Sequence, residues 1–201
     1  MKEVPSDPAP VERHPLQPFL PPDGRLLMLG SFPPQKKRWC IDFYYPNFTN
    51  DMWRVMGLVF HGDPLHFVDK AARRYRKDEI VSFLGNVGLG LYDTACVVRR
   101  LKDNASDAFL EVVEQTDIEA LLAQMPSCRA IVTTGQKATD TICAHFGIDT
   151  PPMCGSVPFS VAGEAFRLYR MPSTSRAYPL PLARKAEAYA AMFAELGMLS
   201  L

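Results

Sequence analysis

The segment FYYPNFTNDMWRVMG, from Phe43 to Gly57, combines aromatic rings with side-chain amides. The phenol of Tyr45 can stack on a flat ring, and the amide of Asn50 can hold a water molecule or a polar edge. Asn50 also precedes a helical pattern, where Asn is a favoured N-cap, and Trp53 fits core packing. Two adjacent tyrosines cannot both be buried on one face of an extended segment, so a purely structural role explains Tyr44 and Tyr45 less well.

The segment MPSTSRAYP, from Met171 to Pro179, places hydroxyls, a guanidinium and a phenol between two prolines. Hydroxyl and backbone N–H groups bind phosphates and hold a nucleic-acid backbone without reading its sequence. The alternative, which composition alone favours slightly, is a turn that caps the next helix. The candidate DNA-binding residues of this loop are Ser173, Thr174, Ser175, Arg176 and Tyr178.

The third segment, GSFPP, follows the apolar run RLLML and spans residues 30–34. Gly30 ends a predicted strand, and two prolines stiffen the chain that leaves it. A simple strand end explains this segment equally well. Together, the three segments supply a stacking platform, an amide and a phosphate-binding loop, which a protein needs to hold a base that has left its helix.

Short apolar runs alternate with helical patterns along the chain, and these elements must position the three segments. The apolar runs predict buried strands within residues 25–31, 87–98 and 128–135, and a hairpin within 158–173. The helical patterns predict helices within residues 50–60, 117–125, 136–147 and 182–197.

Nearly continuous hydrophobic strands separated by helices indicate a mainly parallel sheet that is covered on both faces. Ligands of such sheets bind beyond the carboxyl ends of the strands. The loops after LLMLG, YDTA, VTTG and LYRMPS therefore form the candidate site. Asp93 ends the second strand and is a candidate for orienting a water molecule, although a structural carboxylate that caps the next turn is the more common role.

Residues 1–22 hold much of the proline and no periodic pattern, so we expect an extended or partly disordered arm. Residues 23–201 are enough for one well-packed domain. No apolar run approaches the roughly 20 residues that span a bilayer, and the N-terminus has no apolar signal-peptide core. We therefore expect a cytoplasmic protein without membrane contacts.

The cysteines and charges argue against a metalloprotein and against a strong nonspecific polyanion binder. The five cysteines form no C-x-x-C pair and the four histidines are isolated, so we expect reduced, mostly core thiols, no metal and no other cofactor. The 22 basic residues equal the 22 acidic residues in number. Basic clusters at residues 36–38, 73–77 and 99–102 are each best explained as solvated faces, but together they could form one surface for phosphates.

Three motifs resemble the uracil-DNA glycosylase superfamily, and more closely its thymine/mismatch-specific and hypoxanthine-DNA glycosylase branches. LLMLGSFPP resembles the first family motif, a strand followed by G-x-x-P. YPNFTNDMW is similar without gaps to the Y-P-x-x-x-N-x-x-W segment of the mismatch branch, and MPSTSRA resembles the loop that pinches DNA phosphates. The motifs occur in the family's order, and the resemblance runs from about Arg25 to the C-terminus.

The resemblance implies a three-layer α/β/α sandwich with a short, mainly parallel central sheet. It implies hydrolysis of the N-glycosidic bond of a damaged or mismatched base in DNA, without a metal. The candidate catalytic residues are then Asn50, which corresponds to the helix-start Asn of the hypoxanthine branch, and Asp93. The partner is DNA, bound by a monomer, and the candidate base-binding residues are Gly30, Ser31, Phe32, Pro33, Tyr45, Phe48 and Thr134.

The sequence departs from the family at three positions. Phe32 stands where the mismatch branch has a water-orienting Asn, Met171 replaces a His of other branches, and Thr134 falls near an amide of some relatives. Two alternatives therefore stay open: a glycosylase-fold protein that binds nucleic acid or a nucleotide without chemistry, and a hydrolase of free nucleosides. The second ranks lower because it leaves MPSTSRAYP unexplained.

Overall fold

The structure is a computed structural model that describes residues 10–101 and 109–199. Its helices are the 3-10 helix η1 (Lys36–Arg38) and the α-helices α1 (Met52–His61), α2 (Lys77–Val87), α3 (Ile118–Ala123), α4 (Gln136–Phe146) and α5 (Leu182–Glu195). Its strands are β1 (Val11–Arg13), β2 (Leu26–Gly30), β3 (Val68–Asp69), β4 (Arg74–Tyr75), β5 (Leu89–Asp93), β6 (Ala95–Arg100), β7 (Leu110–Gln115), β8 (Ala130–Thr134), β9 (Ser156–Val161) and β10 (Glu164–Met171).

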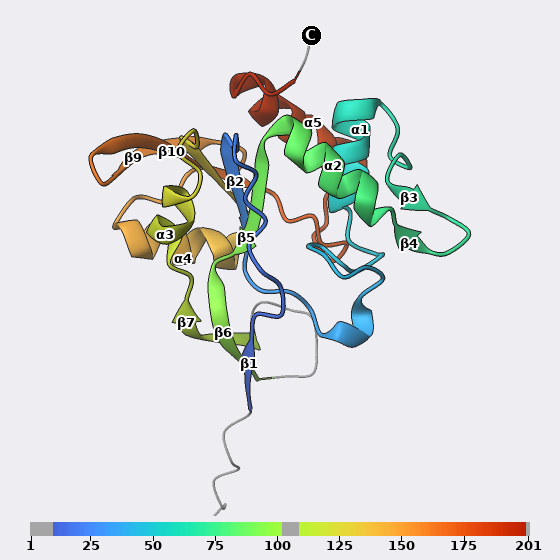
Figure 1. The fold of residues 1–201 in the computed structure, drawn as a ribbon, viewed down its shortest axis with the longest axis horizontal. Helices are drawn as coiled ribbons and strands as arrows, with labels where there is room; N and C mark the ends of the chain where they lie inside the picture. Colours follow the sequence, from blue (N-terminus) through green and yellow to red (C-terminus); the bar gives the residue numbers. More distant parts are fainter. Residues whose placement is uncertain (1–9, 102–108, 200–201) are drawn as a thin grey trace, which may run out of the picture.

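The central sheet has the strand order β5-β2-β8-β10-β9, and only β9 is antiparallel to its neighbour. Figure 1 shows α3 and α4 on one side of this sheet and α1, α2 and α5 on the other. This arrangement confirms the α/β fold with a mainly parallel sheet between two helical layers. The parallel connections bring the carboxyl ends of β5, β2, β8 and β10 to one edge of the sheet.

Local sequence signals explain where the elements begin and end. Helix α3 begins at Asp117, whose side chain accepts a hydrogen bond from the Ala120 amide. Helix α4 ends at Gly147, whose φ of 61° suits glycine, and the β9–β10 hairpin turns at two residues with positive φ. The predicted helices and this hairpin are confirmed, whereas α2 and the β3–β4 hairpin were not predicted.

A second, antiparallel sheet, with the order β1-β6-β7, was also not predicted. The apolar run over residues 87–98 indicated one strand, but the chain breaks at Thr94, between β5 and β6. The Thr94 amide donates to Gly30 O, so the break lies against the end of β2. The second sheet therefore extends beyond the carboxyl ends of the central strands, at the bottom of Figure 1.

The described part of the proline-rich segment, residues 10–22, packs against the domain. Strand β1 pairs with β6, and further along the segment Phe19 forms a β-bridge with Leu91, on the edge strand β5. The Phe19 ring also packs edge-on against Phe43, with ring centroids 5.7 Å apart. Residues 1–9 of the predicted arm lie outside the described residues.

Helices α1 and α5 pack against each other and close one side of the hydrophobic core. Phe193 of α5 is fully buried, and its ring centroid lies 4.9 Å from that of Phe60 in α1. Tyr189, one turn earlier, is also fully buried and donates from its hydroxyl to Pro172 O. None of the described helices is long and apolar enough to cross a membrane.

We predict that Phe193→Ala lowers the free energy of unfolding by about 3–5 kcal/mol, because it leaves a cavity between α1, α5 and the sheet. Urea unfolding measures the loss. Met153→Ala, at a side chain that is 43% exposed, is the control and should change stability by less than about 0.5 kcal/mol. Equal losses for the two variants would contradict this packing.

Candidate functional site

A pocket of about 130 Å³ lies at the carboxyl ends of the central strands. A cavity of about 150 Å³ admits one benzene ring, so this pocket is on the scale of one aromatic ring system. Most of the predicted site residues line it: Gly30, Ser31, Phe32, Pro33, Tyr45, Asn50, Asp93, Thr134, Ser173, Thr174 and Ser175. The three sequence segments, which are far apart along the chain, therefore meet at one place.

The floor of the pocket is built by the ends of three adjacent strands. Gly30 at the end of β2 is in register with Asp93 at the end of β5, and Thr134 ends β8 on the other side. A Cβ at position 30 would lie 2.4 Å from Asp93 Oδ1, so a side chain there would displace the Asp93 carboxyl group. Glycine at this position leaves room for the Asp93 carboxyl group at the pocket floor.

Tyr45 lies between the floor and the aromatic loop. Its hydroxyl is 2.9 Å from Thr134 Oγ1, and its ring meets Trp53 edge-on at 6.0 Å. The backbone of Tyr45 has a φ of 48°, which is uncommon for a bulky residue. A backbone conformation of this kind persists when the surrounding structure holds it in place. Here it places the Tyr45 phenol on the pocket wall.

The other aromatic residues of this loop mainly build the core. Trp53 is 1% exposed and donates from its indole N–H to Tyr44 O. The buried Tyr44 lines the pocket and donates from its hydroxyl to Gln17 O. Burial, and secondarily the nearby Asp93 carboxyl, raise the pKa of Tyr44, so its hydroxyl stays protonated as a donor.

Asn50 is fixed at the start of α1. Its Oδ1 accepts a hydrogen bond from the Met52 amide at 2.9 Å, although the N-cap residue itself is Asp51, so the alternative of Asn50 as the N-cap does not hold at that position. Its backbone carbonyl accepts hydrogen bonds from Tyr75 and Arg54. An amide oxygen has two acceptor sites, so Oδ1 can still accept a hydrogen bond from a water molecule.

A buried ion pair connects α1 to the loop over residues 171–179. Lys185 Nζ lies 2.9 Å from Asp51 Oδ2 and donates to Ser175 O at 3.0 Å. The Asp51 amide donates to Thr174 O. Since the Lys185 side chain is 1% exposed and that of Asp51 is 10% exposed, each charge depends on the other for stabilisation.

The hydroxyls of Ser173 and Ser175 are arranged as donors. Ser173 Oγ accepts the Ser175 amide, and Ser175 Oγ accepts the Ala177 amide. The two O–H groups have no acceptor within residues 10–101 and 109–199. They can therefore donate to an anion outside the protein.

The turn after β2 directs its carbonyls into the protein. Pro33 O accepts from Arg100 and Pro34 O accepts from the Trp39 indole. The backbone N–H groups of Phe32 and Gln35 donate to no group in the described part of the chain. Phe32 lines the pocket, and Gln35 directly follows the lining residue Pro34, so the turn offers one N–H donor at the pocket and a second beside it.

Two residues at the pocket pair with the N-terminal segment, which the sequence analysis did not assign to the site. Asp93 Oδ2 lies 2.9 Å from His14 Nε2, and Arg100 binds both carboxylate oxygens of Glu12. The sequence signal for this placement was the strand-like VER run directly before His14. Isolated charged residues on a proline-rich segment, however, gave no reason to assign Glu12 and His14 to a site.

Three predicted residues do not line the pocket. The Phe48 ring packs on Tyr75, with centroids 5.5 Å apart, and under the Arg54 guanidinium. The structure therefore does not bring Phe48 to the candidate base site. Arg176 is exposed and Tyr178 is half-buried, both in the loop just beyond the pocket-lining serines.

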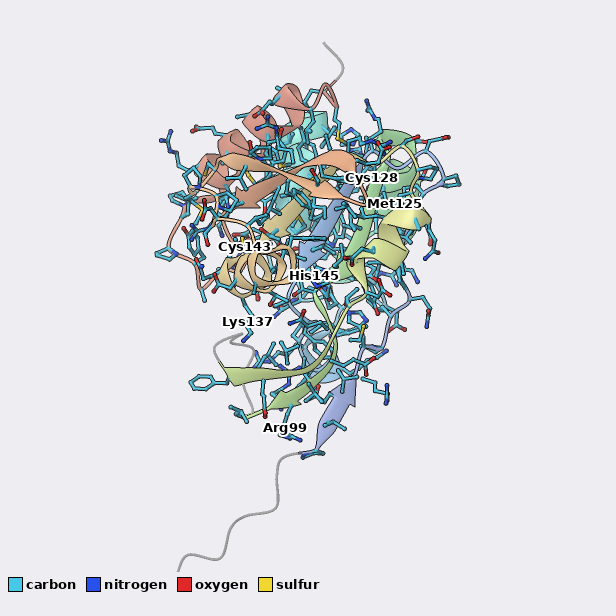
Figure 2. All side chains as sticks on the ribbon, turned by 90° about the vertical axis from the view of Figure 1, so that its left-hand side faces the viewer. Arg99, Met125, Cys128, Lys137, Cys143 and His145 are labelled. Atoms are coloured by element: carbon cyan, nitrogen blue, oxygen red, sulfur yellow. The ribbon has the colours of Figure 1, made fainter. Side chains whose placement is uncertain are left out.

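The three basic clusters do not form one unpaired cationic surface. Several of their cationic groups pair with carboxylates: Lys36 with Asp42, Arg74 with Asp69, Arg76 with Glu79, Arg99 with Glu111, and Arg100 with Glu12. Figure 2 shows Arg99 on the antiparallel sheet at the lower end of the molecule, whereas Figure 1 places the β3–β4 hairpin beside α2. The clusters are therefore mostly neutralised surface features.

The described residues contain no group of three or more His, Cys, Asp or Glu side chains that could hold a metal ion. All five cysteines are free thiols; Cys128 and Cys143 are buried, and Cys154 is exposed. The polar groups of the described residues that line the pocket are hydroxyl, amide, carboxyl, guanidinium and backbone groups.

One solved structure supports the fold. The chain is similar to the solution NMR structure of a candidate uracil DNA glycosylase from Methanosarcina acetivorans, with a TM-score of 0.60 and 21% sequence identity. The match covers 93% of this chain and 99% of that one. No protein-family model and no curated protein matches this chain. At this identity the likeness concerns the fold.

We predict that Lys185→Met lowers the free energy of unfolding by about 3–5 kcal/mol, because it leaves the Asp51 carboxylate buried and unpaired. Urea unfolding measures this loss. The neighbouring Arg184→Met, which breaks an exposed pair with Glu187, is the control and should cost at most about 1 kcal/mol. A small loss at Lys185 would show that the ion pair does not hold α1 to the serine loop.

Proposed function

We propose that this protein is a monofunctional DNA glycosylase. It hydrolyses the N-glycosidic bond of a deaminated or mismatched base, such as uracil or hypoxanthine, that is flipped out of DNA. The observation that supports this proposal is the convergence of Tyr45, Asn50, Asp93 and the loop over residues 173–175 on one ring-sized pocket. A base inside a duplex is out of reach of such a pocket, so the nucleotide must be extruded.

The base enters the pocket between its aromatic wall and its polar floor. The Tyr45 ring stacks on the base, as aromatic side chains do on bases of any sequence. Asp93 Oδ1 and the Thr134 hydroxyl lie at the floor, where they meet the polar edge of the base. The hydrogen-bonding groups on this edge decide which base is accepted. A base that leaves a buried polar group without a hydrogen-bond partner binds less favourably.

Bond cleavage develops positive charge on the sugar and negative charge on the departing base. Asn50 Oδ1 holds the attacking water through the acceptor site that Met52 leaves open. The N–H groups of Phe32 and Gln35 stabilise the negative charge on the base, as donors of an oxyanion hole do. Asp93 is a second group that can orient the water.

The serine loop binds the DNA backbone. Ser173 and Ser175 donate their O–H groups to phosphates on either side of the extruded nucleotide. Arg176 or Tyr178, which follow in the same loop, fill the gap in the duplex. The sequence motifs support the mismatch or hypoxanthine branch of the uracil-DNA glycosylase superfamily as the class of this activity, and the proposal is of a monomer that acts inside the cell.

A second candidate function is the binding of nucleic acid or a nucleotide without chemistry. Phe32 favours it, because this 8% exposed ring lines the pocket where the mismatch branch has a water-orienting Asn. The ring meets His14 edge-on at 5.3 Å and cannot hold a water molecule. In this case the pocket would keep the base without breaking its bond to the sugar.

A panel of oligonucleotides separates the two candidates. Duplexes and single strands that carry uracil, hypoxanthine, xanthine or a G·T mismatch are incubated with the protein, and abasic sites are detected by alkaline cleavage on a gel. A glycosylase produces abasic sites from at least one of these substrates. Selective binding to the altered base without cleavage would support the second candidate and contradict the first.

We predict that Asn50→Ala lowers the single-turnover excision rate by about 100-fold or more, the usual effect of removing one positioned polar group. Loss of the hydrogen bond to Met52 should cost only about 1 kcal/mol of stability. Asn86→Ala, at an exposed position of α2, is the matched control and should leave the rate unchanged. A wild-type rate for Asn50→Ala would remove Asn50 from the mechanism.

A further inference from the structure

Among the described residues that line the pocket, Asp93 carries a carboxyl group and Arg100 a guanidinium group, and both pair with the N-terminal segment over residues 11–14. His14 Nε2 lies 2.9 Å from Asp93 Oδ2, and the Arg100 guanidinium binds Glu12 at 2.9 and 3.1 Å. The His14 side chain is 2% exposed and that of Arg100 is 5% exposed, so these contacts are inside the protein. The N-terminal segment therefore stabilises both charges of the pocket.

The strand geometry explains how one short segment reaches both groups. Glu12 is paired with Val98 of β6, and the His14 amide donates to Cys96 O. Residues two apart in a strand point to the same face, so Glu12 and His14 both face the pocket side. The alternate residues Val11 and Arg13 are exposed.

His14 is hydrogen-bonded to one carboxyl oxygen of Asp93, and the other oxygen remains at the pocket. Oδ2 contacts His14, whereas Oδ1 lies over Gly30, in the space that a Cβ would need, and accepts no hydrogen bond from the described residues. Turning the carboxyl group would remove Oδ2 from its buried partner. Leaving a buried polar group without a partner is unfavourable, which disfavours such a turn.

We propose that His14 is a positioning residue that acts through Asp93: its hydrogen bond to Oδ2 holds Oδ1 over Gly30, aimed at the extruded base and the attacking water. The inference rests on the proposed function and adds to it that the N-terminal segment completes the site. The ring also packs against Tyr92, with centroids 4.6 Å apart. A packing role alone would require the volume of the ring but not its nitrogen.

The test compares His14→Gln with His14→Met, because the two side chains have nearly the same length and only glutamine carries an N–H donor. Single-turnover excision is measured on the substrate that the oligonucleotide panel identifies, together with the dissociation constant of that DNA. The methionine variant should lose about 100-fold in rate, the scale of a small misplacement of a reacting group, with little change in DNA binding. The glutamine variant should stay within about 5-fold of the wild type.

The same pair of changes in an Asp93→Asn background tests whether His14 acts through Asp93. If it does, His14→Met should lower the already reduced rate by less than about 3-fold there, since residues that act as a unit are not additive. An equal loss in both backgrounds, or equal rates for the methionine and glutamine variants, overturns the proposal. If His14→Met does not fold, His14→Gln decides alone. A folded His14→Gln variant whose excision rate is about 100-fold below that of the wild type overturns the proposal.

His145→Gln is the matched control, because His145 also pairs with a carboxylate, Glu119, at 2.9 Å, on a different part of the fold. Helix α4 carries this residue, which is labelled in Figure 2 and does not line the pocket, so the variant should keep the wild-type rate. A loss there would show that the assay responds to general destabilisation.

Crystal structures of the two His14 variants distinguish failure of this inference from failure of the proposed function. Asp93 Oδ1 should remain over Gly30 in the glutamine variant and leave that position in the methionine variant. If Oδ1 keeps its place in the methionine variant, the inference is wrong even where the wild type excises a base. If the wild type excises none, the proposed function fails while the structures still test the positioning role.

Discussion

The close approach of Asp93 to the backbone of Gly30 is the constraint on which the site depends. Parallel pairing puts the ends of β2 and β5 in register, and the missing side chain at position 30 leaves room for the Asp93 carboxyl. Tyr45 then reaches Thr134 across the same opening, on the next strand. A larger residue at position 30 would push these groups apart and fill the pocket floor.

Loops form the walls of the pocket. Buried polar contacts with other parts of the protein, besides contacts with the floor strands, hold these loops in place. Lys185 connects Asp51 at the start of α1 to the serine loop after β10. On the opposite side, Glu12 of β1 holds Arg100, and His14, directly after β1, holds Asp93; Arg100 also fixes the turn at Pro33. The side chains of Lys185, His14 and Arg100 are each at most 5% exposed, so these contacts lie inside the protein.

The fold and the chemistry of this protein follow from different parts of its sequence. The hydrophobic pattern indicates the layered fold, which is shared with the Methanosarcina acetivorans structure at 21% identity. A fold by itself does not define an activity, which depends on a few side chains in the site. In the proposed function, Phe32 and Asn50 are such positions, since the Phe32 ring cannot hold a water molecule whereas Asn50 Oδ1 can still accept a hydrogen bond from one.

The sequence by itself determined the parallel sheet, its principal helices and the loops that form the site, because periodicity and strand ends are local properties. It also pointed to Asn50, Asp93 and the serine loop. Only the tertiary structure placed His14 and Glu12 beside the pocket and turned Phe48 away from it, toward Tyr75. These outcomes depend on contacts between residues about 80 positions apart, or on packing against a hairpin, and no local pattern encodes them.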